Sequence, residues 1–352
     1  MAYTLASLPQ LLSHGFDSVI DVRSPAEWAD DHLPGAVNLP VLDDAERARV
    51  GTIYKQVSPF EARKIGGALV ARNAARHIET ALMDRPGGWR PLVYCWRGGQ
   101  RSNSFATILG QIGWRVAVLE GGYKTWRRLV VTALYDAPVP APVVVLDGNT
   151  GTAKTAVLER LAARGVQVID LEGLANHRGS LFGARAGGQP GQKAFEGRLA
   201  LALAALDPAR PVVVEAESSR IGACRLPPRL WQAMVAAPRV AVAAPRAVRA
   251  GYLLRAYADL TADPAALAAV VDRLRPLHAA EVIARWRAWV AAGAFGDLAE
   301  DLMARHYDPR YARHRARSAP PVAEFGTADL SEAGVDALAA RIAAALAGIA
   351  GG

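Results

Sequence analysis

Short apolar runs alternate with helix-length segments along this chain, and the alternation occurs in two separate sets. The first set lies at 18–22, 90–95 and 115–122, and the second at 143–147, 166–170, 211–218 and 239–244. Apolar runs of this length between helical segments are typical of buried parallel strands. The sequence therefore predicts two α/β units, each built on a parallel sheet.

Three prolines mark the border between the two sets. Pro138, Pro140 and Pro142 alternate with small residues, and proline interrupts both helices and central strands. We therefore expect a first domain over 1–135 and a stiff linker over 136–142. A second domain is expected over 143–245, followed by a mostly helical C-terminal part and tail over 246–352.

Composition narrows the functional classes. The 352 residues carry 41 Lys and Arg against 33 Asp and Glu, a net charge of +8, which suits a polyanion such as RNA. An Arg-rich composition gives the same excess without any partner, so both interpretations stay open. Cys95 and Cys224 are the only cysteines, which excludes a disulfide framework and a cysteine-based zinc cluster. No leader or long apolar stretch is visible, so we expect a cytoplasmic protein without membrane contact.

A cysteine stands where the run 90–95 ends. Cys95 precedes a Gly-rich, Arg-rich turn that leads into a predicted helix starting near Ser102. Consecutive backbone N–H groups before a helix form an anion site, and the same field favours a thiolate. We predict Cys95 as a nucleophile within an anion-binding loop that comprises Trp96, Arg97, Gly98, Gly99, Gln100, Arg101 and Ser102.

Two other interpretations of this loop compete with the first. A cysteine at a strand end is often only packed, although packing alone needs neither the glycine pair nor the arginines. Cys95 and Arg101 also have the Cys-x5-Arg spacing of cysteine phosphatases, in which the loop holds a phosphoryl group for the thiolate. Tyr94 stands where those enzymes carry histidine, which counts against a phosphatase.

A second phosphate-binding motif follows the linker. Residues 148–155 form a Walker-type P-loop between a predicted strand and a predicted helix, with the sequence Gly148, Asn149, Thr150, Gly151, Thr152, Ala153, Lys154 and Thr155. The backbone amides would surround a diphosphate, Lys154 would reach its terminal phosphate, and Thr155 could ligate Mg²⁺. Ala153 replaces a glycine of the motif, which weakens the case for nucleotide hydrolysis more than the case for phosphate binding.

Further polar residues follow the next strands of this unit. Ligand sites in α/β proteins form at the carboxyl edge of the sheet, where these residues would lie. A lone histidine is more often structural, and strand-end acids are often only solvated. The candidates for a second shell around the P-loop are Asp170, Glu172, His177, Arg178, Glu215, Glu217 and Arg220.

These motifs resemble known families. The segment 16–40, with Asp-Val-Arg and His-Leu-Pro-Gly-Ala, is similar to the opening of a rhodanese domain, in which we expect Asp21 and Arg23 to pair structurally. A rhodanese-like domain followed by a P-loop domain, with the stretches 120–128, 170–183 and 217–222, resembles the bacterial tRNA 2-selenouridine synthases. The resemblance implies a rhodanese-like domain, a P-loop NTPase-like parallel-sheet domain and a helical C-terminal part.

The resemblance also implies a reaction. The family acts on the wobble uridine of the tRNAs for Lys, Glu and Gln and replaces the sulfur of 2-thiouridine with selenium. Geranyl diphosphate makes an S-geranyl intermediate, and selenophosphate, delivered by a supply enzyme, donates selenium. Cys95 matches the family's active-site cysteine, and no tightly bound cofactor is expected. That the P-loop binds geranyl diphosphate is a hypothesis of ours.

Two rival functions remain open from the sequence. One is a hydrolase, either a rhodanese-fold phosphatase or a P-loop hydrolase. The other is an RNA-binding sulfur relay with a degenerate P-loop. RNA contacts are expected from Arg-rich stretches that include aromatic residues, at 71–77, 127–129, 273–278, 284–289 and 310–317, although Trp286 and Trp289 could equally be core residues.

Overall fold

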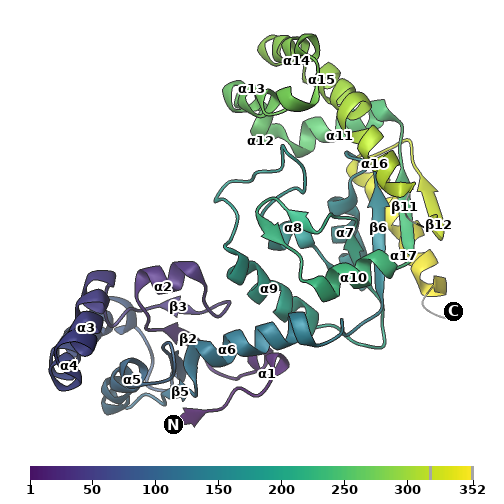
Figure 1. Ribbon diagram of the computed structural model, residues 1–352. Coiled ribbons are helices and arrows are strands. Elements are labelled where there is room, and N and C mark those ends of the chain that lie inside the picture. The colour runs from purple at the N-terminus through teal and green to yellow at the C-terminus, as the bar shows by residue number, and fades with distance from the viewer. Residues whose placement is uncertain (317–318, 350–352) are drawn as a thin grey trace. The chain divides into compact units, whose positions relative to one another are not determined.

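The computed structural model describes residues 1–316 and 319–349, and the chain divides into two compact units. The first comprises Met1–Pro138 and Pro190–Ala205, and the second comprises Val139–Gln189 and Leu206–Gly352. Figure 1 shows the elements of both units. The chain leaves the first unit close to the proline-rich stretch, and it returns to that unit once, over 190–205.

The first unit is built on a five-stranded parallel sheet in the order β1-β5-β4-β2-β3. Its strands are β1 (Ala2–Tyr3), β2 (Ser18–Asp21), β3 (Val37–Asn38), β4 (Pro91–Tyr94) and β5 (Ala117–Leu119). Asp21 at the end of β2 lies opposite Tyr94 at the end of β4. The loops that follow these two strands therefore leave the same edge of the sheet.

Helices cover this sheet and bury a continuous apolar core that includes Val93, Phe105 and Leu109. α3 and α4 pack along one another as a helical hairpin (Figure 1). The helices are α1 (Leu8–Leu12), α2 (Pro25–Asp30), α3 (Asp44–Gln56), α4 (Pro59–His77), α5 (Gln100–Ile112) and α6 (Gly122–Val131), with π-helical turns at Ile78–Leu82 and Thr132–Asp136.

One helix from the second half of the sequence completes the first unit. α9 (Gln192–Ala204) packs against α1 and α6, where Glu196 accepts hydrogen bonds from Arg127 and from Tyr135, the latter at 2.6 Å. A side chain at Gly197 would lie 3.1 Å from the Trp126 ring. The sequence placed this helix in the second domain, because its apolar face does not reveal which unit it packs against.

The second unit contains another five-stranded parallel sheet, in the order β12-β11-β6-β8-β7. Its strands are β6 (Val143–Gly148), β7 (Gln167–Ile169), β8 (Val212–Glu215), β11 (Arg239–Ala243) and β12 (Ala323–Gly326). β6 is the central strand, which places the P-loop in the middle of the carboxyl edge. The predicted class, two parallel α/β units, is confirmed.

The edge strand β12 was not predicted, because its four residues are alternately half-buried and exposed and contain no apolar run. α17 follows it and contributes Leu338, Ile342 and Leu346 to the core beside β6. A short antiparallel hairpin joins β9 (Arg220–Ile221) to β10 (Cys224–Arg225). The tail of the chain therefore completes the second sheet and its core.

The C-terminal part is mostly helical, as the sequence predicted. Its elements α12 to α15 form a separate apolar core around Val271 and Trp286. Among the described residues, no helix has the length and apolar character needed to cross a membrane. The helices of the second unit are α7 (Lys154–Ala163), α8 (Leu171–Leu174), α10 (Pro228–Ala236), α11 (Arg246–Ala256), α12 (Ala258–Thr261), α13 (Pro264–Asp272), α14 (Ala280–Ala292), α15 (Phe295–Leu302), α16 (Asp308–Arg315) and α17 (Glu332–Ile349), with short turns at Arg275–Leu277 and Met303–Tyr307.

Candidate functional site

Cys95 directly follows β4 and is only 3% exposed. Its Sγ accepts hydrogen bonds from the Gly99 N–H at 3.3 Å and from the Ser102 hydroxyl at 3.2 Å. α5 begins at Gln100, two residues before the predicted position. The thiol thus faces the N-terminus of α5 across a turn of four residues.

This environment favours the thiolate. Burial alone would raise the pKa of the Cys95 thiol. Hydrogen bonds from Ser102 and from the Arg97 backbone, together with the charge of Arg101, outweigh burial and hold that pKa below its ordinary value. A partly desolvated thiolate at a helix N-terminus is a strong nucleophile. The geometry therefore supports the predicted role of Cys95.

The glycines of the loop serve packing within the unit. Gly98 has a φ of +65°, and a Cβ there would lie 2.6 Å from the carbonyl oxygen of Leu119. Gly122, with a φ of +57°, presses against the carbonyl of Cys95, to which the Tyr123 N–H donates at 2.8 Å. The start of α6 therefore packs against the Cys95 loop and fixes the position of its backbone. A Cβ built at Gly99 would meet no atom within 4 Å. Of Gly98, Gly99 and Gly122, Gly99 is therefore the one whose backbone a ligand can approach without displacing a neighbour.

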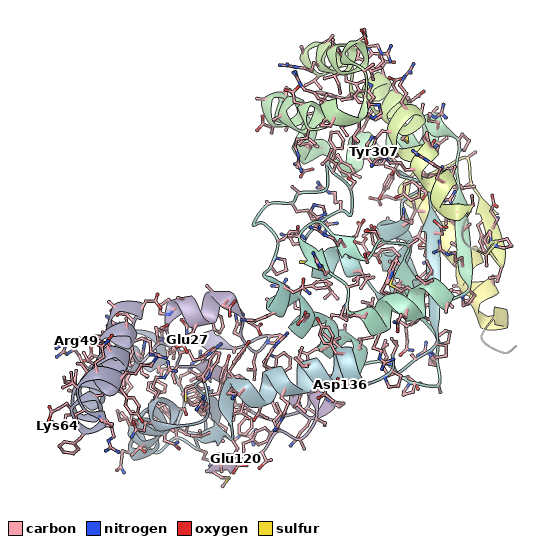
Figure 2. The ribbon with its side chains drawn as sticks, in the orientation of Figure 1. Glu27, Arg49, Lys64, Glu120, Asp136 and Tyr307 are labelled. Carbon is pink, nitrogen blue, oxygen red and sulfur yellow. The ribbon has the colours of Figure 1, made fainter. Side chains whose placement is uncertain are left out.

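The two loop arginines have different surroundings. Arg101 forms an ion pair with Glu27 at 2.6 Å (Glu27 is labelled in Figure 2). To hold a phosphoryl group in the manner of a cysteine phosphatase, Arg101 would have to leave this partner. Arg97 is exposed and has no ion-pair partner within the described residues. Trp96, 37% exposed, stacks on Tyr123 with 5.1 Å between ring centroids.

Asp21 and Arg23 form a buried pair beneath the loop. Both side chains are at most 1% exposed, and Arg23 donates to Asp21 at 2.6 Å and to the carbonyl of Asp31 at 2.6 Å. The Arg23 guanidinium also lies 4.1 Å from the centre of the Tyr123 ring. The pair fixes the turn after β2 and does not reach the surface, as expected for a structural role.

The P-loop lies between β6 and α7. Lys154 is turned back on the loop, with its Nζ 2.9 Å from the carbonyl oxygen of Gly148. Ala153 adopts the left-handed conformation with a φ of +59°, and its buried side chain belongs to the core beside β6. The methyl group that distinguishes Ala153 from the glycine of the motif therefore packs against this core.

A buried ion pair anchors the P-loop to the helical part of the same unit. Arg249 on α11 donates to the carbonyl of Thr150 at 3.0 Å and to Asp308 at 2.8 Å. Asn149 donates to the same carboxylate at 3.1 Å. These contacts support the middle of the loop on one side, and the other side stays accessible to a ligand.

Three carboxyl groups lie beside Lys154 and Thr155. The Thr155 hydroxyl donates to Glu172 at 3.2 Å, and Glu215 accepts the Glu172 N–H at 2.8 Å. Burial, followed by the charge of neighbouring carboxylates, raises the pKa of Glu215 well above its ordinary value and that of Glu217 to about 8. Burial also raises the pKa of Glu172. At neutral pH this cluster therefore retains protons.

Lys154 stays charged within this cluster. Burial opposes the ammonium form, but nearby Tyr311, Glu217 and Glu172 keep the pKa of Lys154 above its ordinary value. A half-buried, charged lysine on a loop of backbone amides attracts an anion strongly. A diphosphate entering here would meet a permanent positive charge.

The P-loop opens into a cavity of about 510 Å³. Of the predicted residues, this cavity is lined by Thr150, Gly151, Thr152, Ala153, Lys154, Thr155, Glu172, Arg178 and Glu217. Gly148 and Asn149 are the two P-loop residues that do not line this cavity. The remaining predicted residues do not line it: Asp170 caps α8, Glu215 is buried below Glu172, Arg220 lies on the β9–β10 hairpin, and half-buried His177 forms a bridge with Ala184.

Sequence reasoning missed the aromatic wall of this cavity. Tyr252, Tyr257, Tyr307 and Tyr311 line it together with Arg185; Tyr307 is labelled in Figure 2. The Tyr311 ring centre lies 5.7 Å from Nζ of Lys154. The i, i+4 spacing of Tyr307 and Tyr311 was a signal for one shared face. Nothing in the sequence linked that face to a loop about 150 residues earlier.

A second, apolar cavity adjoins the first. The two share Thr150, Ser180, Leu253, Tyr257 and Tyr307 as lining residues. Beyond these, the second cavity is lined mainly by carbon, from residues that include Phe182, Leu260, Leu267, Phe295, Leu298 and Leu302. The site thus combines a phosphate-binding end with an adjacent hydrocarbon-lined end.

Several arginines of the stretches proposed for RNA binding are paired within the protein. Trp286 is fully buried and donates to Asp301 at 2.8 Å, so it cannot stack on a base. Ion pairs occupy Arg127 with Glu196, Arg275 and Arg287 with Asp272, Arg285 with Asp301, and Arg315 with Asp147. Arg317 of the last stretch lies outside the described residues. In the stretch 71–77, Arg72 is exposed.

Two family models match this chain. Residues 4–129 match the family model of the rhodanese-like domain. Residues 141–281 match the model described as the tRNA 2-selenouridine synthase AAA domain. Together the two matches account for most of the two units, and they confirm the resemblance found in the sequence.

Curated relatives carry the same combination. A tRNA 2-selenouridine synthase of Bordetella bronchiseptica is 35% identical over 342 residues, which are 88% of this chain and 91% of that protein. Synthases of Pseudomonas syringae and Alcanivorax borkumensis are each 40% identical over 63% and 64% of this chain. Those two matches span 60% and 62% of the relatives' own lengths. The extended match to the Bordetella protein shows that this chain belongs to the tRNA 2-selenouridine synthase family.

Proposed function

We propose that this protein replaces the sulfur of 2-thiouridine in tRNA with selenium, through an S-geranyl intermediate. Its substrates would be geranyl diphosphate, selenophosphate from a supply enzyme, and the tRNAs for Lys, Glu and Gln. The relatives named as tRNA 2-selenouridine synthases support the overall reaction. The geranyl step depends on the geometry of the second unit.

The observation that carries the proposal is that the apolar cavity adjoins the P-loop cavity and shares five lining residues with it. A diphosphate on Lys154 and the loop amides would direct its organic part toward Tyr257 and Tyr307, which line both cavities. The wall beyond them offers leucine and phenylalanine side chains and few groups that could hydrogen-bond to a ribose or a base. A prenyl chain suits this wall, because burying its hydrocarbon surface is favourable.

The first step would be an alkylation. The sulfur of 2-thiouridine forms a bond to C1 of the geranyl group, while the C–O bond to the diphosphate breaks. Lys154 and the loop amides take up the charge that develops on the departing diphosphate. Thr155 and Glu172 are the residues that would hold Mg²⁺ together with phosphate oxygens, although no group of three or more candidate ligands exists among the described His, Cys, Asp and Glu residues.

The second step would exchange selenium for the alkylated sulfur. Alkylation converts that sulfur into a better leaving group, so that a C–Se bond forms at C2 as the geranyl thiol departs. Selenophosphate is an anion that suits the loop between Cys95 and the N-terminus of α5. The Cys95 thiolate would attack the phosphorus of selenophosphate there, so that the P–Se bond breaks and the selenide goes to C2. Water would then release the phosphoryl group from the sulfur as phosphate.

The test uses purified protein with 2-thiouridine-containing tRNA, geranyl diphosphate and Mg²⁺, first without and then with selenophosphate. Mass spectrometry of the nucleosides should show a geranyl adduct that becomes 2-selenouridine only after selenophosphate is added. Lys154→Ala should abolish the geranyl adduct. Cys95→Ser should block the step that uses the thiol, and the nucleoside that accumulates identifies that step. Unchanged 2-thiouridine with tRNA bound would favour the sulfur relay. Phosphate release without nucleoside modification would favour the hydrolase.

A further inference from the structure

The α3–α4 hairpin of the first unit exposes more apolar side chain at its tip than a solvated turn requires. Tyr54 is 57% exposed, Val57 71% and Phe60 61%. All three lie at the end of α3, in the connection to α4, or at the start of α4. A cluster of large exposed apolar residues is typical of a binding surface.

Cations surround this tip. The segment 44–77 contains seven Lys and Arg against three Asp and Glu. The acids are engaged locally: Asp44 accepts the Ala26 N–H, Glu46 caps α3, and Glu61 pairs with Lys64. Among the described residues, no ion-pair partner meets Arg49, Lys55 or Arg63, all of which are exposed. Figure 2 shows Arg49 and Lys64 at the outer edge of the first unit.

A cavity of about 210 Å³ connects this tip with the Cys95 loop. Tyr54 and Arg63 line it on the hairpin side, and Gln100, Arg101 and Ser104 line it on the α5 side. The α5 residues adjoin Ser102, whose hydroxyl contacts Sγ of Cys95. The cavity is large enough for a single planar base, with an aromatic ring at its mouth and amide, hydroxyl and guanidinium groups along its wall.

We infer that the α3–α4 hairpin is the surface on which the first unit binds single-stranded RNA, and that the cavity at its base receives one unstacked nucleobase. This inference rests on the proposed function, which supplies an RNA substrate. Unpaired cations match the phosphate backbone, and exposed aromatic rings offer faces on which unpaired bases stack. An acidic protein partner would match the cations but would not need a base-sized cavity.

The experiment measures binding of the full chain to a fluorescent anticodon stem-loop with 2-thiouridine at the wobble position. Arg49→Ala/Arg63→Ala should weaken binding roughly tenfold and flatten its salt dependence by about 1.4 in the log–log slope. Tyr54→Ala/Phe60→Ala should also weaken binding roughly tenfold, with little change in the salt slope. The matched controls are Arg85→Ala/Arg115→Ala, two exposed arginines elsewhere in the unit and outside the stretches expected to contact RNA, and Met83→Ala, an exposed apolar side chain away from the tip.

A second arm tests the cavity. An RNA that is abasic at the wobble position should bind the wild type more weakly than the intact RNA does. Ser104→Leu, which fills the cavity, should bind both RNAs equally and as weakly as the wild type binds the abasic one. Alkylation of Cys95 by iodoacetamide at the wild-type rate shows that the first unit of each variant is folded.

The outcomes separate the inference from the function on which it rests. If the wild type binds the stem-loop and the hairpin variants bind it equally well, the hairpin is not the RNA surface, while the proposed function stands. Loss of binding in the Arg85→Ala/Arg115→Ala control alone would place the RNA elsewhere. If the wild type binds neither the stem-loop nor whole tRNA, the proposed function fails together with this inference.

Discussion

The Ser102 hydroxyl lies 3.2 Å from Sγ of Cys95 and 3.1 Å from the carbonyl oxygen of Gly99. A hydroxyl has one proton to donate, so it can serve only one of these acceptors at a time. Beside a neutral thiol it can donate to Gly99, and beside a thiolate it can turn to the sulfur. Ser102 therefore stabilises the charged nucleophile without leaving a buried donor unpaired in the neutral state.

Removing this hydroxyl should make Cys95 less reactive. A hydrogen bond to a charged group contributes about 1.5 kcal/mol, and Ser102→Ala loses it. Because the thiolate loses more than the thiol, the pKa rises, and the pH profile of iodoacetamide alkylation should shift to higher pH by about one unit. The measurement is the pH profile of alkylation, with the Cys95 and Cys224 peptides resolved by mass spectrometry.

Ser102→Thr is the matched control, since it keeps the hydroxyl, and its profile should stay close to that of the wild type. An Ala variant with an unshifted profile would show that the Gly99 N–H and the helix N-terminus alone set the reactivity of the thiol.

Gly122 should not tolerate a side chain. An alanine there would adopt a φ of +57° and would lie 2.6 Å from the Gly98 nitrogen and even closer to the Cys95 carbonyl oxygen. The strained backbone and the steric overlap should together lower the free energy of unfolding by about 2–4 kcal/mol. Urea denaturation measures this, and the Cys95 alkylation rate should change with it, because the displaced loop carries the thiol.

Gly110 provides the comparison, since it lies within α5 and an added Cβ there meets no atom within 4 Å. Gly110→Ala should stabilise the protein by about 0.5–1 kcal/mol. Equal effects at the two positions would contradict the packing role of Gly122.

The strands, the Cys95 loop and the P-loop could be predicted because their signals are local. β4, β6 and β8 are continuous apolar runs, and a buried parallel strand needs nothing else. The P-loop is recognised by glycine, lysine and threonine at fixed spacing beside β6. The position of Cys95 before an anion-site turn follows from one strand end and one turn. Each of these predictions uses fewer than ten neighbouring residues.

What could not be predicted depends on partners distant in the sequence. Arg101 is paired with Glu27, 74 positions away, and nothing in either motif indicates that contact. The apolar cavity beside the P-loop is assembled from α11, α13 and α15, whose leucines have the same spacing as ordinary core residues. For the same reason, α9 carries no sign that it packs against α1 and α6 of the first unit. Periodicity identifies a buried face but not the surface that buries it.

Ala153→Gly should change little. Relief of the left-handed alanine is worth about 1–2 kcal/mol. Loss of its buried methyl, at about 0.8 kcal/mol, and the greater freedom of glycine in the unfolded chain, at about 0.4–1 kcal/mol, offset that gain. The free energy of unfolding should therefore stay within about 1 kcal/mol of the wild type, and inorganic diphosphate should bind within roughly twofold, because the methyl faces the core.

Ala153→Val gives the contrast at the same position, since a β-branched residue is a genuine outlier at positive φ. It should lose both stability and diphosphate binding. A large gain in diphosphate affinity for the Gly variant would show that the alanine methyl obstructs the loop after all.

Glu217 should make the protein less stable as the pH rises from about 5 to about 8. Its folded-state pKa of about 8 lies above the ordinary 4.5, so the folded protein holds a proton here that the unfolded chain releases. Stability then falls with pH across that interval, by up to about 1.4 kcal/mol per pH unit for one proton.

Glu217→Gln stays neutral at every pH and should flatten the dependence. Urea denaturation at pH 5.5 and pH 7.5 measures the difference, with Glu159→Gln, an exposed residue of the same cavity, as the control. Parallel pH profiles for the wild type and Glu217→Gln would mean that Glu217 is already ionised in the folded state, and that Lys154 outweighs both its burial and the charge of Glu172.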